Sequence, residues 1–217
     1  MRLRRPRNQI ARQSPRREPY DRVLIVCEGK RTEPLYFRET ANRYRLSTAN
    51  IVVTSHGPDP RTLVREAKKL RSIELRNGEK YDKVYCVFDR DAHVTFDQAC
   101  DEAKASGIEL ARSWPCFEFW LRLHFGFSRR PYERSGNRSA AQNCVEELRR
   151  LLPGYAKGAP DLFHRLEDRL ERTKVDAART LTDAKATGEF NPSTEVHDLI
   201  DYLQSLKPER DLQGHNP

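Results

Sequence analysis

VLIVCEGK, at residues 23–30, is an apolar run that ends at an acid, Glu28. A second run of the same kind, VYCVFDRD at residues 84–91, ends at Asp89 and Asp91. β-Branched and aromatic residues in such short runs are typical of buried strands. In an open parallel sheet, ligands bind beyond the carboxyl ends of the strands, so acids at two neighbouring strand ends would share one pocket. Three carboxylates there repel one another unless a cation lies between them, and such oxygen ligands suit Mg²⁺ or Mn²⁺ in phosphoryl or phosphodiester chemistry.

The two aspartates of the second run are separated by one residue, Arg90. In an extended chain residues i and i+2 point the same way, so Asp89 and Asp91 can address one metal ion while Arg90 points elsewhere. Gly29 allows a tight exit from the first strand that keeps Glu28 exposed. An Asp at a strand end also serves as a helix cap or a turn former, so a purely structural role is the alternative.

Length and composition predict one soluble domain with terminal extensions. The chain has 217 residues, 33% of them charged, and no apolar stretch approaches the ~20 residues that cross a bilayer. We expect a basic disordered arm at residues 1–20, one domain at residues 21–207 and a short tail at residues 208–217.

The net charge of +8 is concentrated at the amino terminus. Residues 1–22 hold eight Arg against Glu18 and Asp21, a local charge of +6, so the rest of the chain carries only +2. An arm rich in Arg and Pro cannot bury enough apolar area to fold alone. Nucleic acid, RNA or DNA, is the partner we expect, because counterion release favours Arg on phosphate; an arm that only aids solubility is the alternative.

The five cysteines include no C-x-x-C pair; they are Cys27, Cys86, Cys100, Cys116 and Cys144. An odd number without such pairs argues against a disulfide framework and against a thiolate zinc site. The first residues also lack the apolar segment of a secretory signal. We therefore expect a cytoplasmic protein in which Cys27 and Cys86 are buried in strands.

Strands and helices alternate through the first half of the chain. Helical patterns at residues 32–45, 63–73 and 96–103 separate the two quoted strands from further strands at 50–54 and 108–111. Beyond Ser113 the apolar periodicity is helical. This order predicts an α/β fold, with a four-stranded, mainly parallel sheet flanked by helices and a helical C-terminal part.

Three polar residues are predicted helix caps. Thr32 precedes Pro34, which is tolerated in a first helical turn, and Ser139 precedes an apolar helical pattern. Asn191, before Pro192, is predicted to start the last helix.

The segment SWPCFEFW, at residues 113–120, follows the fourth strand and so begins at the same edge as the acids. Glu118 falls in the first turn of the next helix, where the helix dipole favours an acid in any case. Glu118 is therefore either a further metal ligand, a support for one, or only a stabilising charge. Most of the surface of this helix is apolar, because it carries Phe117, Phe119 and Trp120. This pattern indicates burial rather than base stacking.

Several cations are candidates for binding a nucleic-acid backbone. Lys30 and Arg31 can neutralise charge that develops on a phosphodiester, although Glu33 would pair with either in a plain salt bridge. His93 either binds a phosphate or lines its loop.

A second group of cations lies in a basic loop, comprising Arg129, Arg130, Arg134 and Arg138 around Tyr132. Such a loop can hold a backbone and stack one base on the tyrosine, although exposed basic loops are common.

Four stretches together resemble the RloB family of bacterial phage-defence proteins: VLIVCEGKRTEPLYF, VYCVFDRDAH, SWPCFEFWLRLHF and NPSTEVHDLIDYL. The resemblance covers about residues 20–206. RloB proteins resemble the Toprim fold of topoisomerases, primases and overcoming-lysogenization-defect nucleases, in which a Glu after the first strand and a D-x-D after the third form a Mg²⁺ site. The resemblance implies that Glu28 is a general acid or base and that Asp89 and Asp91 bind the metal.

The acids and the resemblance together predict a metal-dependent nuclease that hydrolyses RNA or DNA in phage defence. Nucleotidyl or phosphoryl transfer uses the same kind of site and stays open. The alternative of another class is a non-catalytic subunit that binds nucleic acid or an AAA-type ATPase. The chain has no G-x-x-x-x-G-K-[ST] loop, so ATP hydrolysis by that route would come from a partner. Homo-oligomerisation stays open as well.

Overall fold

The computed structural model describes residues 21–46, 51–55, 59–90 and 94–206. The predictions for the arm at residues 1–20, for the tail at residues 208–217, and for Asp91 and His93 therefore lie outside the described residues. Within the described ranges, no helix is both long enough and apolar enough to cross a membrane.

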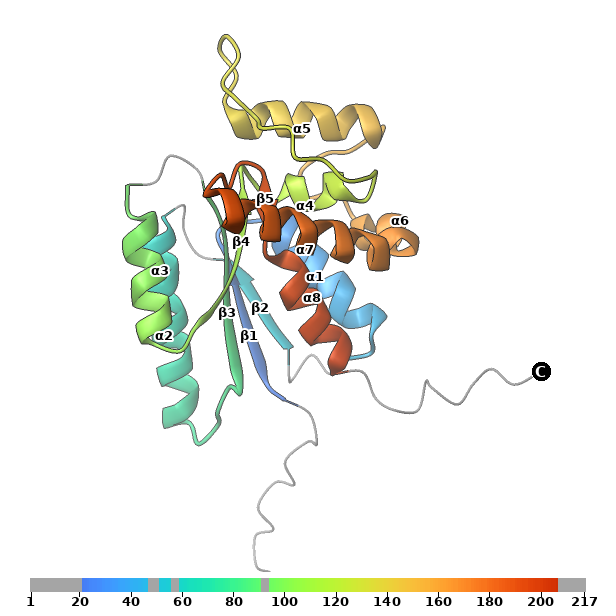
Figure 1. Ribbon diagram of the computed structural model, residues 1–217. Helices are drawn as coiled ribbons and strands as arrows, with labels where there is room; N and C mark the ends of the chain where they lie inside the picture. The colour runs from blue at the N-terminus through green and yellow to red at the C-terminus, as the bar shows by residue number, and fades with distance from the viewer. Residues whose placement is uncertain (1–20, 47–50, 56–58, 91–93, 207–217) are drawn as a thin grey trace, which may run out of the picture.

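The elements follow one another in the predicted order of alternating strands and helices, and then of helices (Figure 1). They are β1 (Val23–Cys27), α1 (Thr32–Arg43), β2 (Ile51–Ser55), α2 (Pro60–Arg76), β3 (Lys83–Asp89), α3 (Phe96–Ala105), β4 (Glu109–Trp114), α4 (Glu118–Leu123), α5 (Ala140–Leu151), α6 (Leu162–Leu166), the 3₁₀ turn η1 (Glu167–Arg169), α7 (Leu170–Thr187), β5 (Ser193–Thr194) and α8 (Val196–Ser205).

One sheet with the strand order β2-β1-β3-β4-β5 forms the centre of the molecule. The four predicted strands are confirmed and are all parallel to one another. A fifth strand, β5, was not predicted; its two residues pair antiparallel with β4. After β1 the chain moves to one side to form β2 and then returns to the other side to form β3. The strand order thus reverses between β1 and β3, which is where ligands bind in sheets of this kind.

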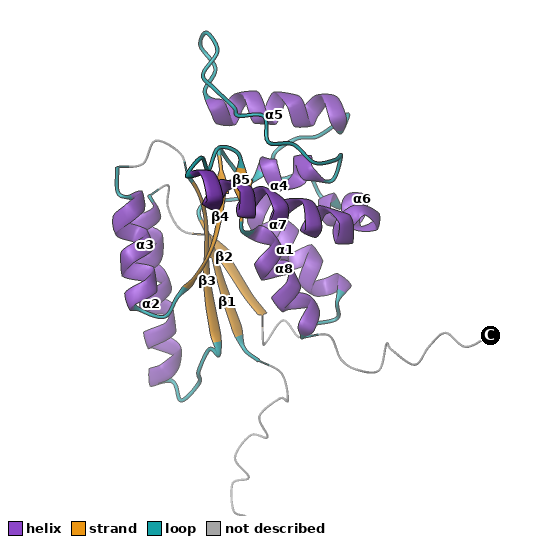
Figure 2. Cartoon of the chain, in the orientation of Figure 1, coloured by secondary structure: helices purple, strands orange, loops and turns teal. Residues whose placement is uncertain are grey.

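Helices cover both faces of the sheet (Figures 1 and 2). On one face, Leu24, Val26 and Phe88 pack against α2 and α3 in one apolar cluster. On the other face, Ile25 and Val87 belong to a larger cluster with side chains of α1, α4, α5, α6, α7 and α8. Because side chains alternate along a strand, each of these strands has an apolar residue at nearly every position, as a sheet buried on both faces requires.

Helix caps agree with the sequence at one of the three predicted positions. Ser139 caps α5, accepting a hydrogen bond from the backbone N–H of Gln142 at 3.2 Å, and the Gln142 side chain accepts one in return from the N–H of Ser139. Thr32 is already the first residue of α1, behind Arg31, and makes no capping bond. The prediction that Asn191 starts a helix is wrong: its segment leads into β5, and the last helix begins only at Val196.

The long helix α7 was not predicted. Its sequence is polar on most sides, and Val175 is 67% exposed. The residues that α7 buries are largely small or polar, such as Thr173, Ala177 and Thr180, so no apolar stripe marks the helix in the sequence.

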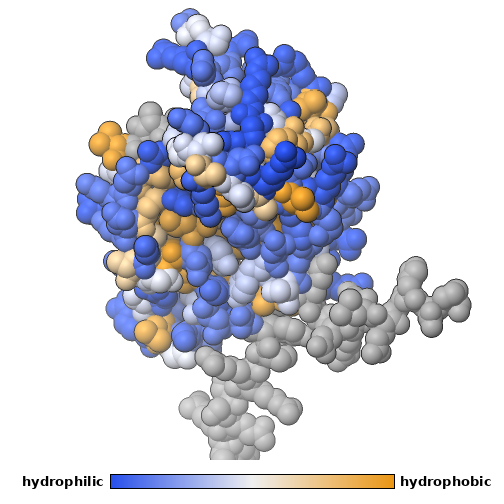
Figure 3. Space-filling view, viewed as in Figure 1, coloured by the Kyte–Doolittle hydropathy of each residue, from blue (hydrophilic) through white to orange (hydrophobic). Residues whose placement is uncertain are grey.

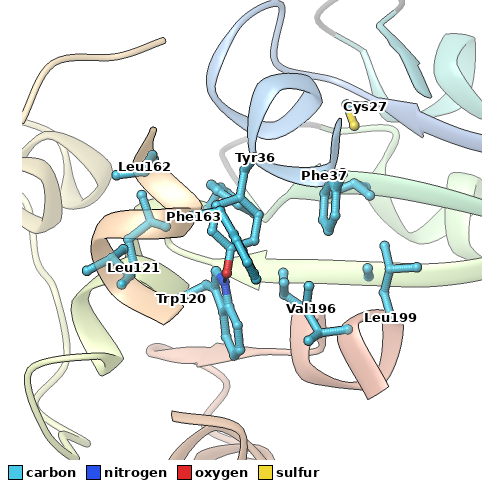
Figure 4. Packing of buried hydrophobic residues seen from close by; sticks show 14 of the residues in the cluster. Cys27, Tyr36, Phe37, Trp120, Leu121, Leu162, Phe163, Val196 and Leu199 are labelled. Atoms are coloured by element: carbon cyan, nitrogen blue, oxygen red, sulfur yellow. Dashed lines mark hydrogen bonds between the residues drawn. The ribbon is translucent and has the colours of Figure 1, made fainter. Parts of the chain in front are cut away.

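The helices α1 and α4 are joined by a buried hydrogen bond. The indole Nε1–H of Trp120 donates to the Tyr36 hydroxyl at 2.9 Å, and both side chains are fully buried. Phe117 and Phe163 contact the Tyr36 ring edge-on. Figure 4 shows Phe163 beside Tyr36. The predicted burial of the Phe117–Leu121 segment is confirmed. This core fixes α1 relative to α4, and each of these helices carries an acid of the site described below.

We predict that Tyr36→Phe lowers the free energy of unfolding by about 1–3 kcal/mol, because it leaves the buried indole N–H of Trp120 without its acceptor. Urea unfolding followed by circular dichroism measures the change. Tyr202→Phe, which removes a hydroxyl bonded to the exposed side chain of Asp21, is the matched control and should cost much less. Equal losses in the two variants would contradict the prediction.

Candidate active site at the carboxyl edge of the sheet

Glu28 and Asp89 lie side by side at the point where the strand order reverses. Glu28 directly follows β1, Asp89 is the last residue of β3, and the two strands pair in parallel. The backbone N–H of Glu28 donates to the Val87 carbonyl at 2.9 Å, and the backbone N–H of Asp89 donates to Glu28 Oε2 at 3.2 Å. The predicted meeting of these two acids is therefore present in the structure, whereas the third predicted acid, Asp91, is outside the described residues.

A pocket of about 400 Å³ opens at these two acids, and we call it the acidic pocket. This volume lies within the range of ordinary ligand sites. Its walls come from the turn after β1, the start of α1, the end of β3 and the loop after α5. They are formed by Glu28, Gly29, Lys30, Arg31, Thr32, Glu33, Asp89 and Lys157.

Glu33 is a third described acid of this pocket, whereas from the sequence it is predicted only as a salt-bridge partner of Lys30 or Arg31. It lies in the first turn of α1 and is 9% exposed. Its carboxylate occupies the space in which a side chain of residue 29 would begin, so that a Cβ at Gly29 would overlap it. Gly29 therefore leaves the space that the Glu33 carboxylate fills, and a side chain at residue 29 would displace that carboxylate.

Glu118 is buried behind Lys157, outside the residues that line the acidic pocket, and its charge is compensated there. It is the first residue of α4 and is 2% exposed. The Tyr155 hydroxyl donates to its Oε1 at 2.9 Å, and Lys157 Nζ is 3.1 Å from the same oxygen. The loop that carries these two residues is tied to α1, because the backbone N–H of Gly158 donates to Thr32 Oγ1 at 3.1 Å.

The acids of this site are close enough to influence one another's ionisation. Burial raises the pKa of Asp89 well above its usual range, and the neighbouring charges of Glu33, Glu118 and Glu28 raise it further, while Lys157 opposes them. Burial also raises the pKa of Glu33 to about 7, with smaller contributions of the same sign from Glu118 and Glu28. Without a cation these acids therefore tend to hold protons near neutral pH, and a bound cation would favour their charged forms.

The donor set of the acidic pocket is chemically suited to a hard divalent cation, since it consists of carboxylates. Among the described residues, however, no three acid, His or Cys side chains converge closely enough to hold an ion as they stand. Glu28, Glu33 and Asp89 are the described acids that line the pocket, and Asp91 would be the remaining candidate.

The predicted cations are placed in two regions. Lys30 and Arg31 are exposed at the acidic pocket. Arg130 and Arg134 are exposed in the loop before α5, whose tip rises above that helix in Figure 1. Arg129 in the same loop instead donates to the backbone carbonyls of Glu189, at 2.8 Å, and of Pro192.

Tyr132 does not offer its ring for stacking on a base. It is 7% exposed, donates its hydroxyl to Glu147 Oε2 at 2.9 Å and contacts the Phe119 ring edge-on. The interpretation of Tyr132 as an exposed stacking residue is therefore wrong, and the tyrosine anchors the loop to α4 and α5.

All five cysteines are unpaired, and the two in the strands are buried as predicted. Burial raises the pKa of Cys86 to about 12 and that of Cys27 well above its usual range. Since the thiolate is the nucleophilic form, neither cysteine is suited to attack a substrate.

Comparison with known proteins gives one match. A family model described as RloB-like protein matches residues 23–203. The match spans both strand ends that carry the acids, together with α4 and the loop of Lys157. No curated protein matches the chain, and no solved structure does.

We predict that Glu33→Gln flattens the pH dependence of stability in metal-free protein. The pKa of Glu33 is raised in the folded state, so the folded protein keeps a proton that the unfolded chain has released, and stability falls as the pH rises toward 7. With a folded-state pKa of about 7, Glu33 lowers the free energy of unfolding by about 2 kcal/mol between pH 5.5 and pH 8. Urea unfolding of both proteins at the two pH values measures the difference, and equal declines would contradict the prediction.

Proposed function

Because this chain belongs to the RloB-like protein family, we propose that it is a metal-dependent nuclease that hydrolyses phosphodiester bonds of RNA or DNA. The observation that carries the proposal is the meeting of Glu28 and Asp89 in one pocket, at the edge of the sheet where parallel α/β folds bind ligands. A glutamate after β1 and an aspartate at the end of β3 also fit the Toprim-like pattern that the resemblance implies.

In this proposal Asp89 and Asp91, with Glu28 and Glu33, hold Mg²⁺ or Mn²⁺. The ion would activate a water molecule and stabilise charge on the phosphate. The raised pKa values of Glu33 and Asp89 support this assignment, because buried acids that hold protons without a metal become charged when a cation neutralises them. Of the two lysines that line the pocket, Lys157 is engaged by Glu118. Glu118 then acts through Lys157, keeping this cation at the wall of the pocket rather than in contact with the metal.

The protein's own side chains have distinct parts in the proposed reaction. Glu28, fixed by the backbone N–H of Asp89, completes the site or moves a proton to or from the reacting water. Lys30 and Arg31, exposed at the acidic pocket, contact the phosphate backbone, and Lys157 adds positive charge next to the acids. Arg130 and Arg134 extend this contact along the nucleic acid, and His93 stays a candidate phosphate ligand.

A role in bacterial phage defence, in the cytoplasm, follows from the resemblance and from the unpaired cysteines, which suit a reducing compartment. In such a role the nuclease activity would have to be inhibited until infection, and an AAA-type ATPase partner or self-association could provide that control.

We expect purified full-length protein to cleave at least one of three substrates with Mg²⁺ or Mn²⁺: tRNA, single-stranded RNA or plasmid DNA. Glu28→Gln and Asp89→Asn should each abolish cleavage, by at least about 10²-fold, while circular dichroism shows an unchanged fold. Glu109→Gln, at the opposite edge of the sheet and paired with Lys83, is the matched control and should retain activity.

The outcomes separate the alternatives. Full activity in both variants would exclude the acidic pocket as the active site. Metal binding without cleavage would favour an enzyme that a partner activates, and nucleic-acid binding without metal binding would favour a non-catalytic subunit.

We also predict that Gly29→Ala lowers cleavage strongly, because the new Cβ would displace the Glu33 carboxylate. Gly107→Ala, in the turn before β4 at the opposite edge of the sheet, is the control: its new Cβ meets nothing, and its φ of +62° costs stability without touching the pocket. Cleavage rates of both variants at saturating Mg²⁺ test the prediction. Unchanged activity of Gly29→Ala would mean that the position of Glu33 does not matter for the reaction.

A further inference from the structure

A second pocket lies at the same edge of the sheet, on the face that α2 and α3 cover. Its cavity is about 230 Å³ and is lined by Arg90, Phe96, Arg112, Trp114, Phe190 and Glu195, among others. We call it the aromatic pocket. Figure 3 shows that hydrophobic side chains gather near the middle of the face drawn there, with hydrophilic ones around them.

The aromatic pocket is joined to the acidic pocket through consecutive residues of one strand end. Asp89 faces the acidic pocket, and the next residue, Arg90, faces the aromatic pocket. This division follows from the alternation of side chains along a strand. A chain molecule that crosses the carboxyl edge of β3 would therefore contact both pockets with neighbouring units.

Flat ring surfaces form part of the wall. The Trp114 and Phe190 rings are 9° from parallel, with centroids 6.3 Å apart, and both side chains are partly exposed. The Arg90 guanidinium carbon lies 4.0 Å from the centroid of the Phe96 ring and 5.1 Å from that of the Trp114 ring. Aromatic faces and a planar guanidinium are the surfaces on which nucleic-acid bases stack.

The charges of this pocket are balanced, in contrast to those of the acidic pocket. Arg90 Nη1 is 2.8 Å from Asp97 Oδ1, and Arg112 forms a two-pronged ion pair with Glu195, with Nε to Oε2 at 2.7 Å. Since each arginine has a carboxylate partner, the pocket does not favour a phosphate or a carboxylate ligand. A planar, uncharged group with polar edges suits it better.

The volume limits the size of that group. Sites for drug-sized ligands occupy about 300–1,000 Å³, and the aromatic pocket is smaller. It therefore has room for one ring system rather than for a stretch of polymer.

We propose that the aromatic pocket binds a single nucleobase next to the phosphodiester that is cleaved. The inference rests on the proposed function and deepens it, because a base can enter such a pocket only when it is unpaired. The substrate class is then single-stranded or locally unpaired nucleic acid.

Binding of labelled single-stranded oligonucleotides, measured by fluorescence anisotropy in EDTA so that no cleavage occurs, tests the inference. Each oligonucleotide is compared with an abasic chain of the same length and charge. The intact oligonucleotide should bind wild-type protein roughly five- to one-hundred-fold more tightly than the abasic chain. Trp114→Leu should lose most of this preference and bind both with the weaker affinity. Tyr202→Leu is the matched control and should keep the preference, because Tyr202 is a partly exposed aromatic residue on α8 whose ring contacts Tyr85 at a tilt, near the opposite edge of the sheet.

Tryptophan fluorescence gives a second readout that does not depend on the Trp114 variant folding. Trp120 is fully buried and Trp114 is partly exposed, so a base in the pocket should quench Trp114 emission. A nucleoside monophosphate should quench it and ribose 5-phosphate should not, and Phe190→Leu should weaken the quenching.

The inference is overturned if wild-type protein binds no oligonucleotide, if it does not distinguish the intact from the abasic chain, or if Trp114→Leu and Phe190→Leu keep the full preference. These outcomes are separate from failure of the proposed function, which would be binding with the expected base preference but no cleavage under any metal condition. Conversely, cleavage by a protein that shows no base preference would support the proposed nuclease function and contradict base binding in the aromatic pocket.

Discussion

The parallel pairing of β1 with β3 is the constraint on which the rest of the molecule depends. These strands carry Glu28 and Asp89, and they are adjacent only because the chain forms β2 on one side of β1 before returning to the other. The same reversal sends α1 to one face of the sheet and α2 and α3 to the other. One topological step thus produces the core on both faces and the crevice in which the acids meet.

The acidic pocket lowers the stability of the fold when no cation is bound. Burying carboxylates next to one another disfavours their charged forms, and the rest of the fold must offset that cost. Glu118 has its charge compensated locally, by Lys157 and the Tyr155 hydroxyl. The Tyr36–Trp120 contact, which fixes α1 against α4, holds the helices that carry Glu33 and Glu118 in place against this repulsion.

Local patterns were sufficient for the four parallel strands and for the meeting of Glu28 with Asp89, because buried strands have a distinctive composition and strand ends converge in any parallel sheet. Other parts depend on approaches between distant segments. Lys157 reaches the pocket from a loop more than a hundred residues away in sequence, which is tied to α1 through Gly158 and Thr32. Glu33 lies only four residues from Gly29, but no sequence pattern shows that its carboxylate turns into the pocket. β5 is too short and α7 too polar to produce a periodic signal.

Asp89 and Arg90 face opposite sides of the sheet, and this has a consequence for how β3 tolerates insertions and deletions. A single residue gained or lost within β3 would rotate every following side chain to the other face. The carboxylate would then point toward α3 and the guanidinium into the acidic crevice, with the apolar layers exchanged as well. The length of this strand is therefore fixed to the residue.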